Sequence, residues 1–201
     1  MGIKQTIHVF DVDGTITHGD SFIGLLRHFE PDRLLRCMMW AIMAKKILLG
    51  IVKRDLSQAK LALLAHIWRG RRKNAIELDC TAYFNQTLRH DIRLKAYAYI
   101  MDLKRHQPGE KIVLLSASCT EWLAPLANYL EAHDLICTRL QYDKAGIFKG
   151  LYATPNCKGE EKLRRLLEKY PTSGYEFVCY GNSPADKYLK TISKQFYYRY
   201  F

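Results

Sequence analysis

The amino-acid sequence predicts an α/β fold, namely a Rossmann-like, doubly wound parallel sheet with an all-helical cap inserted after the first strand. Two short and almost continuously apolar runs, residues 7–10 and 112–115, are typical of strands in a parallel sheet that is covered on both faces. After residue 90, strand and helix patterns alternate, which indicates parallel winding. The stretch between the two runs shows helical spacing only. We therefore assign residues 1–17 and 91–201 to the core domain and residues 18–90 to the cap.

The first element, the strand at residues 7–10, is followed directly by two carboxylates. Asp11 and Asp13 stand one residue apart, and Gly14 and Thr15 form a turn after them. Such residues also make ordinary acidic turns. However, ligands of parallel sheets bind at the carboxyl ends of the strands, and two neighbouring carboxylates repel each other unless a cation or a shared proton relieves them. The pattern therefore indicates a metal site.

The second segment, residues 18–90, is predicted to be helical and strongly basic. Apolar residues recur at three- and four-residue spacings, for example at Leu25, Leu26 and Phe29, which favours helices that pack on one another. Between residues 21 and 76 there are twelve basic and three acidic side chains, so this stretch carries +9 of the net charge of +11. A positive field of this size favours an anionic molecule or an anionic surface as the partner.

Residues 34–52 combine apolar and basic side chains, and two interpretations fit them. Their longest uncharged runs are residues 37–44 and 47–52. A membrane span needs about 20 consecutive apolar residues, so the segment is too interrupted to cross a bilayer. A helical layer packed beneath a solvated basic face fits the pattern, and so does a helix that lies in a membrane interface. The basic tract at residues 69–73 lacks interleaved aromatic residues, which argues against nucleic acid as a partner.

The remaining elements alternate between helices and strands, with Gly and Pro at several of the boundaries. In order, they are a helix over 92–106, a strand over 111–116, a helix from 120 to about 131, a strand over 135–140, a hairpin-like excursion at 142–148, a helix from about 159 to Pro171, a strand over 175–180 and a final edge strand or packing tail at 196–201.

Polar side chains stand at the ends of three predicted strands and at the start of one helix. Singly, each of them fits an ordinary role in a turn or at a helix end. Together they supply a nucleophilic carboxylate, a second carboxylate, a hydroxyl, a fixed cation and a metal ligand. That set suits phosphoryl transfer, in which catalysis is mostly positioning and charge neutralisation. The set comprises Asp11, Asp13, Ser116, Lys162, Asn182 and Asp186.

These motifs resemble those of the haloacid dehalogenase superfamily, which includes phosphatases with an aspartate nucleophile. Residues 11–15, D-V-D-G-T, are similar to its first motif, D-x-D-G-T, and residues 114–116 are similar to its second, an apolar strand that ends in Ser or Thr. Lys162 resembles the third-motif lysine, with Lys158 as a weaker candidate, and residues 181–186 resemble the fourth motif, G-D-S-x-x-D. The insert is similar to the helical cap of the phosphoserine-phosphatase-like branch.

The resemblance implies a role for each of these side chains. Asp11 is the expected nucleophile, which forms an aspartyl-phosphate, and Asp13 is the expected general acid and base. Thr15, Ser116 and Lys162 are expected to bind the phosphate. Mg²⁺ is the expected cofactor, because its preferred ligands are oxygen atoms. Its implied ligands are Asp11, Asp13 through the backbone carbonyl, Asn182 and Asp186.

Asn182 departs from the family pattern, because the family usually has a metal-binding aspartate at this position. A neutral amide oxygen can still coordinate Mg²⁺, but it removes one negative charge from the site. We therefore expect a weaker affinity for Mg²⁺ than an aspartate would give.

The predicted function is Mg²⁺-dependent hydrolysis of a small anionic phosphomonoester, phosphoserine-like or other. The patterns S-A-S at 116–118 and C-x-G-x-E-K at 157–162 are also similar to bacterial phosphatidylglycerophosphate phosphatases, so a lipid phosphatase acting at the membrane surface is the alternative. A catalytically weak protein that binds the membrane surface is the alternative from another class, and Asn182 is the reason for it.

The six cysteines are scattered and no signal peptide precedes the first strand, so we expect a cytoplasmic protein, with peripheral contact at the inner membrane face in the lipid alternatives.

Overall fold

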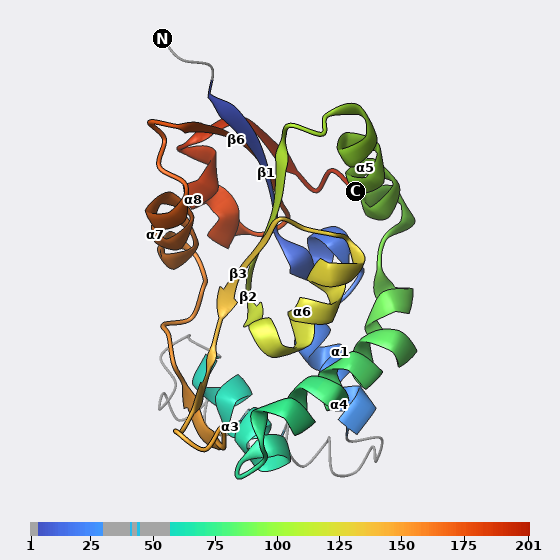
Figure 1. The fold of residues 1–201 in the computed structure, drawn as a ribbon, viewed down its shortest axis with the longest axis vertical. Helices are drawn as coiled ribbons and strands as arrows, with labels where there is room; N and C mark the ends of the chain where they lie inside the picture. Colours follow the sequence, from blue (N-terminus) through green and yellow to red (C-terminus); the bar gives the residue numbers. More distant parts are fainter. Residues whose placement is uncertain (1–3, 30–40, 42–43, 45–56) are drawn as a thin grey trace.

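The computed structural model describes residues 4–29, 41, 44 and 57–201, and its centre is a five-stranded parallel sheet with strand order β3-β2-β1-β6-β7 (Figure 1). The first strand of the chain is the central one and pairs with β2 and β6. The predicted Rossmann-like, doubly wound sheet is therefore confirmed. The strands are β1 (Gln5–Phe10), β2 (Lys111–Cys119), β3 (Asp134–Thr138), β6 (Tyr175–Gly181) and β7 (Ser193–Tyr198).

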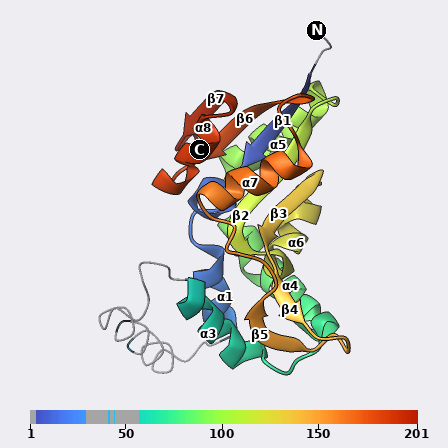
Figure 2. The ribbon, with the colours of Figure 1, turned by 90° about the vertical axis from the view of Figure 1, so that its left-hand side faces the viewer.

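Helices cover both faces of the sheet, which explains why the apolar runs of the strands are continuous. Ile7 and Val9 belong to a buried cluster with α7 (Glu160–Lys169) and α8 (Lys187–Lys190). Phe10 belongs to the opposite cluster, which also contains Ile100 of α5 (Leu94–His106) and Leu126 of α6 (Thr120–Tyr129). Figure 2 shows α7 and α6 on opposite sides of the strands.

The register of the strands brings the chain segments that follow them to one edge of the sheet. Phe10 lies opposite Leu114 of β2 and opposite Tyr180 of β6. The residues that come next in each strand are therefore neighbours. They include Asp11 after β1 and Ser116 within β2.

The described part of residues 18–90 is helical and packs at this same end of the molecule, the lower end in Figures 1 and 2. Its helices are α1 (Ser21–Phe29), α3 (Ser57–Trp68) and α4 (Lys73–Gln86), followed by a short 3₁₀ turn at Leu88–Asp91. Phe22, Leu64 and Trp68 are buried in the cluster that also contains Trp122 of α6.

Residues 34–52, which fit either a packed helical layer or a membrane-interface helix, lie outside the described residues apart from positions 41 and 44. Neither interpretation is therefore tested. Within the part of the chain that the structure describes, no helix is both long enough and apolar enough to span a membrane.

The predicted strand at 135–140 is wrong in its extent, because the chain leaves the main sheet after Thr138. The hydroxyl of Thr138 donates to the carbonyl of Ala117 (2.9 Å), and the next residues form β4 (Leu140–Tyr142), which pairs with β5 (Phe148–Tyr152) in a separate antiparallel hairpin. Apolar residues resume at Leu140 and Tyr142, and no Gly or Pro stands between the two strands, so the sequence pattern alone does not mark the break.

This hairpin is bound to the turn that joins α3 and α4. The amide of Phe148 donates to the carbonyl of Arg71 (2.9 Å), and the amide of Gly70 donates to the carbonyl of Phe148 (3.2 Å). The amide of Lys73 donates to the carbonyl of Gly146 (2.8 Å). The described helices of the insert are therefore fixed to the core by backbone hydrogen bonds as well as by apolar packing.

Candidate active site

A cavity of about 460 Å³ opens at the carboxyl edge of the sheet. Residues from the described part of the insert form one side of it, including Asp20, Ser57 and Lys60. Residues from the core form the other side, and they include most of the side chains that the sequence singled out. These are Asp11, Asp13, Ser116, Lys162 and Asn182, together with the weaker candidate Lys158.

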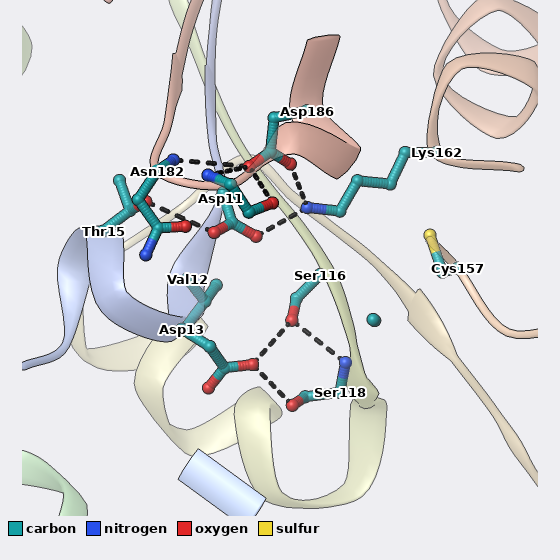
Figure 3. A network of polar contacts seen from close by, with 12 residues as sticks. Asp11, Val12, Asp13, Thr15, Ser116, Ser118, Cys157, Lys162, Asn182 and Asp186 are labelled. Atoms are coloured by element: carbon teal, nitrogen blue, oxygen red, sulfur yellow. Dashed lines mark hydrogen bonds and ion pairs between the residues drawn. The ribbon is translucent and has the colours of Figure 1, made fainter. Parts of the chain in front are cut away.

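Asp11, Lys162 and Asp186 form a buried ion-pair triad beside this cavity (Figure 3). The ammonium of Lys162 lies 2.6 Å from Oδ1 of Asp11 and 2.8 Å from Oδ1 of Asp186. The second oxygen of Asp186 accepts hydrogen bonds from the hydroxyl (2.7 Å) and the amide (3.0 Å) of Ser183. Both oxygens of Asp186 are thus engaged, and this residue does not line the cavity.

The charges of the triad follow from burial and from the ion pairs. Burial raises the pKa of Asp11 to about 6, although Lys162 acts in the opposite direction. Burial alone would lower the pKa of Lys162, but the two carboxylates raise it above its ordinary value. Burial alone would raise the pKa of Asp186, but Lys162 and the hydrogen bonds of Ser183 bring it below its ordinary value. At neutral pH the triad therefore carries two negative charges and one positive charge.

Asp13 lies at the same edge, but its carboxylate is held by a different set of groups. Oδ1 accepts the amide of Ser21 (2.7 Å). Oδ2 accepts the hydroxyls of Ser118 (2.7 Å) and Ser116 (3.2 Å). Figure 3 shows the two serines converging on this carboxylate, away from Lys162. The two aspartates of the first motif are thus separated: Asp11 is paired with a cation, whereas Asp13 is bound by neutral donors.

Ser21 and Ser118 were not predicted as site residues. A signal for Ser118 was present in the sequence, because residues i and i+2 of a strand point to the same face, and Ser118 follows Ser116 at that spacing. No such signal exists for Ser21, since its contact with Asp13 depends on how the insert begins.

The turn after Asp11 brings Asn182 against the first motif. Gly14 has φ +76, a conformation that favours glycine, and an added Cβ there would lie 2.1 Å from Nδ2 of Asn182. Thr15 was expected to bind phosphate, but it does not line the cavity, and its hydroxyl donates to Oδ2 of Asp11 (3.3 Å).

The oxygen atoms at this edge fit a hard divalent cation. Carboxylate, amide and backbone carbonyl oxygens are the ligands that Mg²⁺ prefers, and the triad has an excess of one negative charge to offset. The described residues contain no cluster of three or more His, Cys, Asp or Glu side chains arranged for a metal. Any magnesium shell here would therefore rely on amide, backbone or water oxygens as well as Asp11.

Comparisons with known proteins give a family and a set of similar folds. A family model described as haloacid dehalogenase-like hydrolase matches residues 8–189. Protein CicA of Caulobacter vibrioides is 27% identical over 205 residues, which is 100% of this chain and 89% of the relative.

Two solved structures share the fold at low sequence identity. A protein of unknown function from Bordetella pertussis Tohama I matches with a TM-score of 0.78 at 17% identity, over 96% of this chain and 89% of that one. A phosphoserine phosphohydrolase-like protein from Francisella tularensis subsp. tularensis SCHU S4 matches with a TM-score of 0.66 at 19% identity, over 96% and 86%. Because the family model spans most of the sequence, the chain belongs to the haloacid dehalogenase-like hydrolases.

Proposed function

We propose that the protein is a Mg²⁺-dependent phosphomonoester hydrolase that acts through an aspartyl-phosphate on Asp11. The observation that carries this proposal is a buried carboxylate, fixed by Lys162, that lines a cavity with a second, separately held carboxylate, Asp13. A nucleophile and an acid/base in different environments are what two-step phosphoryl transfer needs.

In the first step, an oxygen of Asp11 attacks the phosphorus and the bond between phosphorus and the ester oxygen breaks. Asp13, which enters this step protonated, gives its proton to the departing oxygen and becomes a carboxylate. Lys162 and the hydroxyl of Ser116 hold the phosphoryl oxygens. Thr15 supports the reaction through its contact with Asp11, not through the phosphate.

In the second step, water attacks the phosphorus of the aspartyl-phosphate and the bond to Asp11 breaks. Asp13, which is now a carboxylate, takes a proton from the water, and inorganic phosphate leaves. The hydrogen bonds from Ser21 and Ser118 hold the Asp13 carboxylate in place for this step.

The residues that would hold Mg²⁺ are Asp11, the backbone carbonyl of Asp13 and Asn182. Asp186 would support the site by holding Lys162, because both of its oxygens are already bound. When bound, Mg²⁺ neutralises charge on the phosphoryl group.

We also propose that residues 18–90 act as the cap and select a small anionic ester. The positive charge of the insert and the presence of Lys60 and Lys158 in the cavity support an anionic substrate. The similarity in fold to the phosphoserine phosphohydrolase-like protein from Francisella makes phosphoserine one ester to try.

The test is turnover of a chromogenic phosphomonoester with Mg²⁺, in the wild type and in Asp11→Asn. We expect Asp11→Asn to abolish turnover, and the matched control Asp102→Asn, on the exposed side of α5, to leave it unchanged. A parallel screen compares soluble phosphate esters with dispersed phosphatidylglycerophosphate. If the wild type hydrolyses none of them with any divalent metal, the enzyme proposal is wrong and a binding protein takes its place.

A further inference from the structure

A buried chain of hydrogen bonds runs from Trp122 to Asp13. The indole Nε1 of Trp122 lies 3.0 Å from the hydroxyl of Ser21, which lies 3.2 Å from the hydroxyl of Ser118. The hydroxyl of Ser118 lies 2.7 Å from Oδ2 of Asp13. Trp122, Ser21 and Ser118 are each at least 96% buried, so water does not compete for these contacts.

The direction of this chain is fixed by its two ends. An indole N–H only donates, and at the other end the hydroxyl of Ser118 donates to Oδ2 of Asp13. Ser118 uses its single hydroxyl hydrogen on Asp13, so its oxygen accepts from Ser21. Ser21 therefore uses its hydrogen on Ser118, and its oxygen accepts from Trp122. Each donor in such a one-way chain polarises the next, which strengthens the last bond, the one to Asp13.

Ser116 also donates to Asp13, but it is the weaker holder of this carboxylate. Its hydroxyl is 3.2 Å from Oδ2 and also accepts the amide of Ser118 (3.0 Å). Ser116 lines the cavity, and the proposed function gives its hydroxyl to the phosphoryl oxygens. When Ser116 turns to the phosphate, Ser118 remains as the hydroxyl that holds Oδ2.

Ser21, which links Trp122 and Ser118 in this chain of hydrogen bonds, stands at the start of the insert. The amide of Ser21, the first residue of α1, binds Oδ1 of Asp13 (2.7 Å). The carbonyl of Ser21 accepts the hydroxyl of Tyr83 from α4 (2.7 Å). Ser21 is therefore held from α4 and α6 while it holds Asp13.

We propose that Ser118 is a positioning residue that, backed by Ser21 and Trp122, sets the orientation of the Asp13 carboxylate toward the reacting phosphoryl group. This inference rests on the proposed function. It predicts that Ser118 contributes to the rate of the chemical steps and not to substrate binding.

The experiment compares kcat and KM of four variants with the wild type, using the chromogenic ester. For Ser118→Ala we expect kcat to fall about tenfold to a hundredfold, as for loss of a hydrogen bond to a charged group, with KM within about twofold. Ser118→Thr keeps a hydroxyl and should recover most of kcat. Trp122→Phe keeps an aromatic ring but removes the first donor, and kcat should fall about threefold. The matched control is Ser193→Ala, which removes a serine hydroxyl bonded to Leu189 far from the site.

A double-mutant cycle separates a chain from independent packing effects. In the Ser118→Ala background, Trp122→Phe should lower kcat no further, because the link to Asp13 is already missing. If the two substitutions lower kcat independently, so that their effects multiply, Trp122 does not act through Ser118 and the inference is wrong.

The outcomes distinguish this inference from the proposed function. If the wild type turns over and Ser118→Ala keeps its kcat, or if only KM changes, the positioning role alone is refuted. If the wild type is inactive, both are refuted. Should thermal melts show that Ser118→Ala does not fold, Trp122→Phe decides the question, since an unchanged kcat in that folded variant refutes the inference.

Discussion

Replacing Lys162 with methionine should destabilise the protein strongly at neutral pH. The substitution keeps an unbranched side chain of similar length but removes the ammonium that lies 2.6 Å from Asp11 and 2.8 Å from Asp186. The carboxylate of Asp186 is inaccessible to solvent and that of Asp11 is 8% exposed, so water does not replace the lost partner. Breaking a buried pair of this kind costs about 3–5 kcal/mol. At about 2–4 °C per kcal/mol for a chain of this size, the melting temperature should fall by roughly 10 °C.

The stability that Lys162→Met removes should become smaller as the pH falls. Without Lys162, the pKa of the two buried carboxyls rises in the folded state, whereas unfolded aspartates keep a pKa near 3.8. Between pH 6 and pH 8 the folded variant then binds a proton that the unfolded chain does not bind. Its stability therefore rises as pH falls, by as much as about 1.4 kcal/mol per pH unit for one proton.

The assay is a series of thermal or urea unfolding curves at pH 6, 7 and 8 for the wild type and the variant. Lys158→Met is the matched control, because Lys158 lies four residues earlier, is exposed and makes no ion pair with any residue that the structure describes. It should change the melting temperature by less than about 2 °C. A Lys162→Met protein as stable as the control at pH 8, or equally destabilised at all three pH values, would refute the reasoning.

Three further predictions concern the metal ligand, the turn after the nucleophile and a partly buried ion-pair cluster on α7. Asn182→Asp should tighten Mg²⁺ about tenfold in a calorimetric titration, because a full negative charge replaces an amide oxygen, and an equal or weaker affinity would contradict it. Gly14→Ala should lower the free energy of unfolding by about 2 kcal/mol or more in urea, since φ is +76 and the new Cβ meets Asn182 at 2.1 Å. Hydrogen bonds from Arg164 and Arg165 lower the pKa of Glu161 to about 2 from 4.5, so its stabilising contribution is present above pH 4.5 and is lost as pH falls toward 2. The melting temperature of Glu161→Gln should therefore depend less on pH in this acid range than that of the wild type. An identical pH dependence in the two proteins would contradict the role given to Glu161.

The sequence was sufficient to predict which strand ends meet, because apolar runs and helical spacing define the order of the elements. It predicted that Asp11, Ser116 and Asn182 lie at one edge, and all three line the cavity there. It also ranked Lys162 above Lys158, and the structure pairs Lys162 with the nucleophile candidate. Asp11 and Asn182 follow directly from strands, Ser116 lies within β2, and Lys162 lies in the first turn of a helix, so their positions depend on local pattern and on the parallel register.

The parts that could not be predicted depend on contacts between distant segments. The amide of Ser21 reaches Asp13 only because of the path that the chain takes after Thr17, and Trp122 meets Ser21 across some hundred residues of sequence. Likewise, apolar spacing does not show that β4 leaves the sheet after Thr138. Hydrogen-bond partners of this kind carry no periodic signal, since they require the packed arrangement itself.

The pairing of the β4–β5 hairpin with the α3–α4 turn also has a consequence for how the chain folds. The hydrogen bonds of Gly70, Lys73 and Phe148 close a loop of about 75 residues that contains β2, α6 and β3. Such long-range contacts slow folding, and they form only when both segments are already near their final positions. The insert excised as a fragment would leave these backbone groups without partners. In native-state hydrogen exchange, the amides of Gly70 and Lys73 should therefore open together with that of Phe148, as one cooperative unit that joins two separate parts of the sequence.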